Sequence, residues 1–185
     1  MPQITEIKTR RFRISPISPD KVSDAWIRWT GDPILMAQMN ARVVKLTHAD
    51  LQRYVAGAWK TKRMVLGIYT LTDADHIGLY EAAIDPRNAN VTLDTLIDQQ
   101  KYALPNVLTE TDPALLQFLG KDLRLEKAVA QVVESNTPLI RHYEATGWLK
   151  EGVLRQEVEA VAGGRRLDMV QFGRLLDSNP AASAA

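Results

Sequence analysis

The sequence predicts an α/β protein in which helices cover both faces of a mixed, mostly antiparallel sheet of roughly six to seven strands. Apolar and polar residues alternate between Arg10 and Ile17, which is typical of a half-buried strand. Helical spacing of apolar residues follows, and Gly163-Gly164 separates two long strand-like segments near the end. The 185 residues are 45% hydrophobic and 24% charged, which fits one globular domain over residues 1–176.

Two helices are predicted after the first strand. Ser18 is expected as the N-cap of the first, with Pro19 at its first helical position. The segment Gly31-Asp32-Pro33 ends this helix, whose apolar face carries Val22, Ala25, Trp26 and Trp29. Thr47 begins the second helix, in which Leu51, Tyr54, Val55 and Trp59 recur at helical spacing.

The later elements alternate between strands and helices. Asp112 and Pro113 are expected as the N-cap and first position of a helix, because a proline inside a helix costs about 3 kcal/mol. A further helix over residues 137–145 is ended by Gly147. Strands are expected over residues 63–71, 76–84, 91–97, 126–133, 148–160 and 165–176.

Composition and charge exclude several classes of function. Lys plus Arg number 23 against 22 for Asp plus Glu, so the net charge of +1 supports neither a nucleic-acid partner nor a membrane-surface partner. The absence of cysteine excludes disulfides, thiolate metal sites and a cysteine nucleophile. His48, His76 and His142 share no metal-ligand spacing and are expected at the surface. The first residues lack the apolar region of a signal peptide, so a cytoplasmic location is expected, and residues 177–185 are expected to form a disordered tail.

Several motifs, in order, resemble the GNAT acyltransferases, and within them the RimJ/RimL-like branch. The similarity covers roughly residues 8–176 and is most specific at the segment from Glu134 to Trp148, ESNTPLIRHYEATGW. It also includes TRRFRISPI followed by Ser18-Pro19-Asp20, WTGDP from Trp29 to Pro33, and IDPRNAN from Ile84 to Asn90. The resemblance implies the GNAT fold, and acetyl-CoA as co-substrate in a splay between the strands at residues 91–97 and 126–133.

The resemblance places the loop that cradles the pyrophosphate of CoA at residues 101–107. Leu104 and Asn106 stand where the family has glycines, and Pro105 has no N–H to donate. With a helix starting at Asp112, Glu110 and Asp112 are expected beside the phosphates, where their charge is unfavourable. Two interpretations stay open, a rebuilt donor site and a structural loop that no longer binds phosphate. The cofactor contacts implied by the resemblance are Leu96, Lys101, Leu104, Asn106 and Asn136.

The same resemblance implies catalytic roles, each with a structural alternative. Asn136 contacts the pantetheine arm or serves only as a helix N-cap. Tyr143 is the general acid for the leaving thiolate or an ordinary core tyrosine. Thr92 stands where the family often has a glutamate base, so Asp94 on the same strand face, or Glu81 on the neighbouring strand, is the candidate base. Trp29 is the candidate pocket residue for the acceptor.

These expectations define competing functions. The first is an N-acyltransferase in which a small-molecule amine or a peptide N-terminus attacks the thioester of acetyl-CoA directly. The second is a GNAT-fold protein that has lost acetyl-CoA turnover and acts as a binding or interaction module. The third is a transferase with a different acyl donor. The last two strands could also supply the edge of a homodimer.

Overall fold

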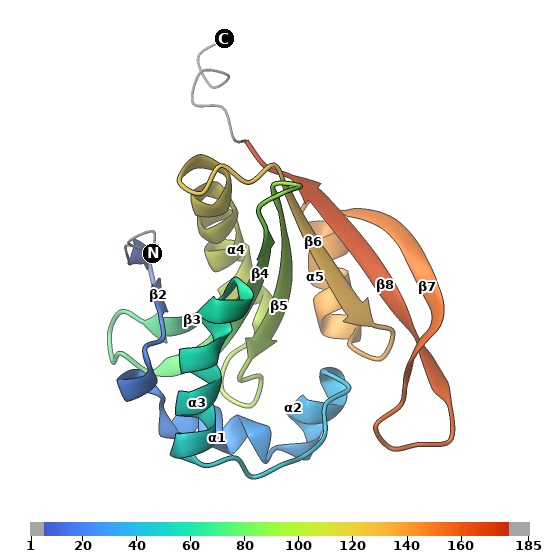
Figure 1. The fold of residues 1–185 in the computed structure, drawn as a ribbon, viewed down its shortest axis with the longest axis horizontal. Coiled ribbons are helices and arrows are strands. Elements are labelled where there is room, and N and C mark those ends of the chain that lie inside the picture. The colour runs from blue at the N-terminus through green and yellow to red at the C-terminus, as the bar shows by residue number, and fades with distance from the viewer. Residues whose placement is uncertain (1–5, 178–185) are drawn as a thin grey trace.

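The computed structural model describes residues 6–177 and contains one eight-stranded sheet in the order β1-β2-β3-β4-β5-β6-β8-β7 (Figure 1). All neighbouring strands are antiparallel except β5 and β6, which are parallel, so the predicted fold class is confirmed. The strands are β1 (Ile7–Lys8), β2 (Phe12–Pro16), β3 (Arg63–Thr70), β4 (His76–Asp85), β5 (Asn90–Ile97), β6 (Lys127–Val133), β7 (Leu149–Glu159) and β8 (Arg166–Leu175).

The sheet has one strand more than the roughly six to seven expected, because β1 pairs with β2. The Thr9 hydroxyl closes the turn between them, donating to the Phe12 carbonyl at 3.0 Å and accepting from the Phe12 N–H at 3.1 Å. A strand of two residues is too short to show periodicity in the sequence. The predicted tail at residues 177–185 lies, after Asp177, outside the described residues.

Helices pack against both faces of this sheet. The helices are α1 (Asp24–Thr30), α2 (Pro33–Gln38), α3 (His48–Ala58), α4 (Leu104–Lys121) and α5 (Thr137–Ala145), with short 3-10 turns at Pro19–Lys21 and Trp59–Thr61. In Figure 1, α3 lies in front of the sheet and α4 and α5 lie behind it. Each face has its own apolar core, and the alternation along β4 divides Leu79 from Tyr80 between the two.

The first helical segment differs from the prediction. Ser18 and Pro19 begin only a 3-10 turn, and the Ser18 side chain makes no capping bond. The α-helix starts later, where the Ser23 hydroxyl accepts from the Trp26 N–H at 3.2 Å. Both serines carry helix-start chemistry, and the tertiary fold selects the second.

The helix α2 was not predicted. The Asp32 carboxylate accepts from the N–H groups of Ile34 and Leu35 at 2.9 and 3.1 Å, and Pro33 occupies the first turn. The break at Gly31-Asp32-Pro33 therefore both ends α1 and begins α2.

The predicted start of α4 at Asp112 was wrong. The helix begins at Leu104, so Pro105 lies in the first turn and Pro113 lies inside the helix. The earlier start buries Leu104, Val107 and Leu108 in the core behind the sheet. Each such side chain contributes about 1.5–3 kcal/mol, which together outweighs the roughly 3 kcal/mol cost of an interior proline.

The other helices follow the prediction. Thr47 and Asp50 form a capping box at α3, and Asn136 caps α5, after which Gly147 takes a left-handed φ of 81°. Over residues 6–177, no helix is long and apolar enough to cross a membrane. The same residues hold no cluster of three or more side chains suited to a metal ion.

Candidate functional site

The two parallel strands meet at one end and separate toward the other. Asn90–Thr92 of β5 pair with Lys127–Val129 of β6, and beyond this point the two facing edges have no ladder partner. Each strand keeps its antiparallel neighbour on its other side along its length, because β4 pairs with β5 and β8 pairs with β6. The separated edges therefore present unpaired backbone N–H and C=O groups to a ligand between them.

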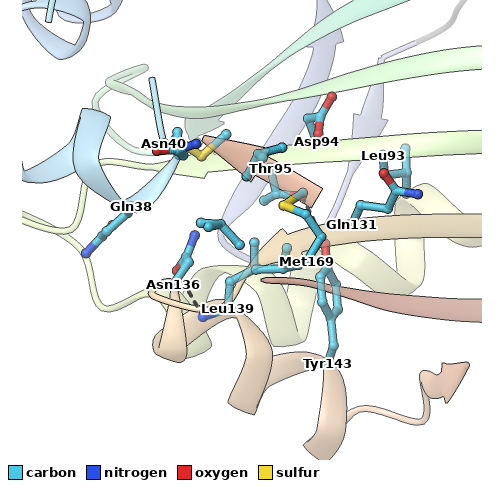
Figure 2. A pocket seen from close by; sticks show the side chains of 14 residues that line it. Gln38, Asn40, Leu93, Asp94, Thr95, Gln131, Asn136, Leu139, Tyr143 and Met169 are labelled. Carbon is cyan, nitrogen blue, oxygen red and sulfur yellow. Dashed lines mark hydrogen bonds between the residues drawn. The ribbon is translucent and has the colours of Figure 1, made fainter. Parts of the chain in front are cut away.

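A cavity of about 200 Å³ occupies this gap. Figure 2 shows side chains from β5, β6, α5, β8 and the end of α2 around it. The gap opens toward the carboxyl ends of both parallel strands, which is also where α4 and α5 begin (Figure 1). The lining residues are Gln38, Met39, Asn40, Leu93, Asp94, Thr95, Gln131, Val132, Val133, Asn136, Leu139, Tyr143, Val158 and Met169.

Tyr143 approaches the gap from the face that α5 covers. Its ring is 1% exposed and packs against Trp148 and Phe172, while its hydroxyl lies 3.3 Å from the Thr95 hydroxyl. Burial, followed by the negative charge of Asp112, raises the pKa of the Tyr143 hydroxyl well above its ordinary value. The hydroxyl therefore stays protonated at neutral pH and can donate to a group in the gap.

Asp94 approaches the gap from the opposite face of β5, because consecutive residues of a strand point to opposite sides. Its side chain reaches solvent and has no hydrogen-bond or ion-pair partner among residues 6–177. Partial desolvation by the surrounding protein, followed by the charge of Glu81, raises the pKa of Asp94. A free carboxylate with a raised pKa is suited to accept a proton.

Glu81 has different surroundings, although it stands directly opposite Asp94 in the β4–β5 register. One of its oxygens accepts from the Tyr54 hydroxyl, and the other pairs with the Arg63 guanidinium. Glu81 does not line the cavity in the gap. Of the two candidate bases, the structure therefore brings Asp94 to the cavity and engages Glu81 in structural contacts.

Asn136 stands at the start of α5, where it caps the helix and also lines the cavity. It is 4% exposed, and its side-chain oxygen accepts from the Leu139 N–H at 3.4 Å, which caps the helix. It also lines the cavity, and its side-chain NH₂ donates to no group within residues 6–177 (Figure 2). The free NH₂ is available to a ligand carbonyl in the gap.

No model of a protein family and no curated protein sequence matches the chain. Solved structures do match it. A GNAT-family acetyltransferase from Bacillus anthracis is 19% identical, with 92% of this chain and 98% of that chain covered and a TM-score of 0.75. An acetyltransferase of Salmonella typhimurium that modifies the N-terminal serine of a 50S ribosomal subunit protein is 13% identical, covering 94% and 100% at a TM-score of 0.79. The chain has the GNAT fold. Spermidine N-acetyltransferase from Vibrio cholerae, solved with CoA and spermine, is 16% identical and covers 90% and 96% at a TM-score of 0.72.

The loop that precedes α4 in this GNAT fold differs from the sequence expectation. Leu104 is 4% exposed and Asn106 is exposed, and both adopt helical backbone rather than glycine-like geometry. Between residues 98 and 107 no residue has a positive φ. Neither Leu104 nor Tyr102 fills the gap between β5 and β6, while Lys101 and Asn106 line a separate groove beside β2 and β3.

The prediction that Glu110 and Asp112 stand beside the phosphates depended on a helix that begins at Asp112, and that start was wrong. Because α4 starts at Leu104, the acids lie well inside the helix rather than at its beginning. Glu110 accepts from the Thr9 hydroxyl at 2.7 Å and from the Arg11 backbone N–H at 2.6 Å. Asp112 is 6% exposed and is bound to Tyr80 and His142 in the core. The objection to a phosphate at the start of α4 on grounds of charge is therefore removed.

Several other expected site residues lie in the cores. Trp29 is 3% exposed, donates its indole N–H to Asp98 at 3.1 Å and does not line the cavity. Leu96 packs in the core on the α1–α3 face. Of the histidines expected at the surface, His142 is 4% exposed and His76 is largely enclosed, whereas His48 is exposed.

Some residues at the cavity were missed by sequence reasoning. Thr95 neighbours Asp94, but its link to Tyr143 depends on a contact between β5 and α5. Gln38 and Asn40 belong to α2 and its end, a helix that the pattern did not predict. Gln131 and Met169 reach the cavity through the pairing of β6 with β8, which no local motif announces.

Proposed function

We propose that this protein is an N-acyltransferase that moves an acetyl group from acetyl-CoA to an amine by direct attack. The observation that carries the proposal is the open gap between β5 and β6, with Asp94 on one side and Tyr143 on the other. A cavity of about 200 Å³ suits the reacting thioester and amine, and the longer CoA chain would extend out of the mouth.

The mechanism follows from the two faces of β5. Asp94 takes a proton from the acceptor ammonium, directly or through water, and the freed amine attacks the thioester carbonyl carbon. Unpaired N–H groups on the edge of β5 stabilise the oxyanion that forms. As the C–S bond breaks, the electron pair leaves with sulfur, and the Tyr143 hydroxyl donates a proton to it. The new amide nitrogen loses its second proton, which returns to the Tyr143 oxygen directly or through water. The chain has no cysteine, so no acyl group passes through a protein thioester.

The donor arm is proposed to run from the gap toward the start of α4. Asn136 offers its side-chain NH₂ to a pantetheine amide. The N-terminal turn of the 18-residue α4 offers a positive dipole end for the phosphates, with Lys101 nearby in sequence. Pro105 removes one N–H from that turn, so phosphate binding is expected to depend more on the dipole and on side chains.

The acceptor is proposed to be a small-molecule amine or a peptide N-terminus. Two structural neighbours act on acceptors of these kinds, the N-terminal serine of a ribosomal protein and spermidine. The free carboxylate of Asp94 on the acceptor face supports a cationic amine in both cases.

Calorimetry with acetyl-CoA and desulfo-CoA, followed by turnover with a panel of amines, tests the proposal. Wild-type protein should bind both ligands, and Tyr143→Phe should bind them equally well with kcat lowered by about 10²-fold or more. Thr92→Ser, on the exposed face of β5, serves as a control that should keep full activity. Absence of binding at millimolar ligand would refute the proposal and favour a binding module or a different acyl donor.

A further inference from the structure

Asn40 ends α2 in the left-handed backbone conformation, with φ of 48°. Its own N–H donates to the Ala37 carbonyl at 3.1 Å, and the Ala41 N–H donates to the Met36 carbonyl at 2.8 Å. This is the Schellman arrangement, in which glycine or asparagine is the usual residue. The backbone conformation therefore favours glycine or asparagine at position 40. It does not explain why the residue is asparagine rather than glycine.

The Asn40 side chain reaches across the molecule to the β7–β8 hairpin. Its NH₂ donates to the Glu159 carbonyl at 2.9 Å, and its carbonyl oxygen accepts from the Val161 N–H at 2.9 Å. A side-chain amide has one donor group and one acceptor group, so it pairs with both backbone groups as a neighbouring strand would. Glycine could end the helix but could not make these two hydrogen bonds, which we call the clamp.

The clamp joins two walls of one cavity. Gln38, Met39 and Asn40 line the cavity on the side of α2, while Val158 and Met169 line it from β7 and β8. On its other side the α2 wall is tied to the segment after β5, where the Gln99 side chain donates to the Gln38 side chain at 2.6 Å. Figure 1 shows α2 and the hairpin tip at the end where β5 and β6 separate.

We propose that Asn40 is a positioning residue that fixes the width of the acceptor side of the cavity and so restricts the size of the amine. This inference rests on the proposed N-acyltransferase function. Asn40 touches no reacting atom: it holds α2 against the hairpin, and that distance sets the space in front of Asp94. Asn136 and Tyr143, on the donor side, are carried by α5, whereas the side chain of Asn40 bonds to Glu159 and Val161.

The variant Asn40→Gly separates the clamp from the helix end, because glycine keeps the Schellman turn. Asn40→Asp is the second variant, since it keeps the acceptor for Val161 but faces the Glu159 carbonyl with an oxygen. Asn88→Gly is the matched control: Asn88 is exposed in a turn and donates its NH₂ to Asp85 at 2.6 Å, away from the cavity.

Hydrogen exchange measures the clamp without any activity. The Val161 amide should exchange roughly tenfold faster in Asn40→Gly and remain unchanged in Asn88→Gly. Unchanged exchange at Val161 in Asn40→Gly would overturn the clamp itself.

Steady-state kinetics measure its consequence. In Asn40→Gly, KM for a small amine should rise roughly tenfold, kcat/KM for bulkier amines should rise relative to the small one, and kcat and the affinity for desulfo-CoA should be kept. Faster exchange with the same order of preference among amines would overturn the positioning role. Failure of the wild-type protein to bind acetyl-CoA would instead refute the underlying function and leave the exchange result standing.

Discussion

Asp94 and Glu81 face each other across β5 and β4, yet only one carboxylate is free. Glu81 is held by Tyr54 and Arg63, whereas Asp94 has no such partner within residues 6–177. Like charges directly opposite in an antiparallel pair destabilise a sheet. Burial and the neighbouring Glu81 raise the pKa of Asp94, so its ionised form costs stability, which is expected at a site that needs a base.

Replacing Asp94 with asparagine tests both the loss of stability that the carboxylate causes and its role as the base. Folding raises the pKa of Asp94, so ionisation destabilises the folded state at pH values above that pKa. Asp94→Asn should therefore raise Tm slightly at neutral pH and lower kcat/KM by about 10²- to 10⁴-fold. Thermal unfolding and turnover measured on one preparation check both effects. A variant with wild-type kcat/KM would exclude Asp94 as the base.

His76 provides a prediction about pH. Burial lowers the pKa of His76 from 6.5 to about 4, and its Nδ1 lies 2.6 Å from the hydroxyl of Ser23, which caps α1. The folded state favours the neutral ring of His76. Its contribution to the free energy of unfolding is therefore complete above pH 6.5 and is lost as the pH falls toward 4. The free energy of unfolding should fall by up to about 3 kcal/mol over that range.

Chemical denaturation at several pH values measures this effect. His76→Gln should show a flatter profile, whereas His48→Gln, which removes an exposed histidine, should follow the wild type. Identical profiles for wild type and His76→Gln would contradict the assignment.

At the level of elements, α4 and α5 are joined by a buried polar network behind the sheet. Asp112 on α4 accepts from the Tyr80 hydroxyl of β4 at 2.5 Å and pairs with His142 of α5 at 2.8 Å. Tyr80 also lies 2.7 Å from the Thr111 hydroxyl. Because Tyr143 follows His142 in α5, the network helps to fix the helix that carries the proposed acid.

Removing the central carboxylate tests the network. Asp112→Ala leaves the buried His142 nitrogen without its partner and should cost about 3–5 kcal/mol of unfolding free energy. Glu110→Ala is the matched control on the same helix, because its partners are near the surface, and it should cost about 1 kcal/mol or less. If the two variants lost the same unfolding free energy in urea denaturation, the buried network around Asp112 would contribute no more to stability than the contacts of Glu110 near the surface.

Prediction of elements from sequence succeeded where local signals and tertiary packing agree. The capping box at Thr47 and the segment from Asn136 to Gly147 gave the correct helices. It failed at α4, because Pro113 is a strong local signal that the burial of Leu104 and Leu108 overrides. It failed at α2 because six residues show too little periodicity to separate a helix from a turn.

At the level of the molecule, the sequence predicted the fold class and, through the resemblance, the gap between β5 and β6, but it did not predict the first strand or the walls of the gap. The resemblance pointed to Tyr143 and Asn136, the spacing along the strand pointed to Asp94, and all three line one cavity. Trp29 and Leu96 do not line it, because both belong to the core between the sheet and helices α1 to α3. The sequence pattern alone does not distinguish an apolar core residue from one that lines a pocket. Asn40 and Met169 could not be found, since their places depend on contacts between segments distant in the chain.

The whole account depends on acetyl-CoA entering between β5 and β6, and hydrogen exchange with and without acetyl-CoA tests this most directly. We expect acetyl-CoA to protect backbone amides at residues 93–95 and 130–133 from exchange, because β5 and β6 no longer pair with each other there. The backbone amides of β2, three strands away from β5 in the sheet, should be unchanged. Unchanged exchange at the gap amides when acetyl-CoA is added would contradict the central claim.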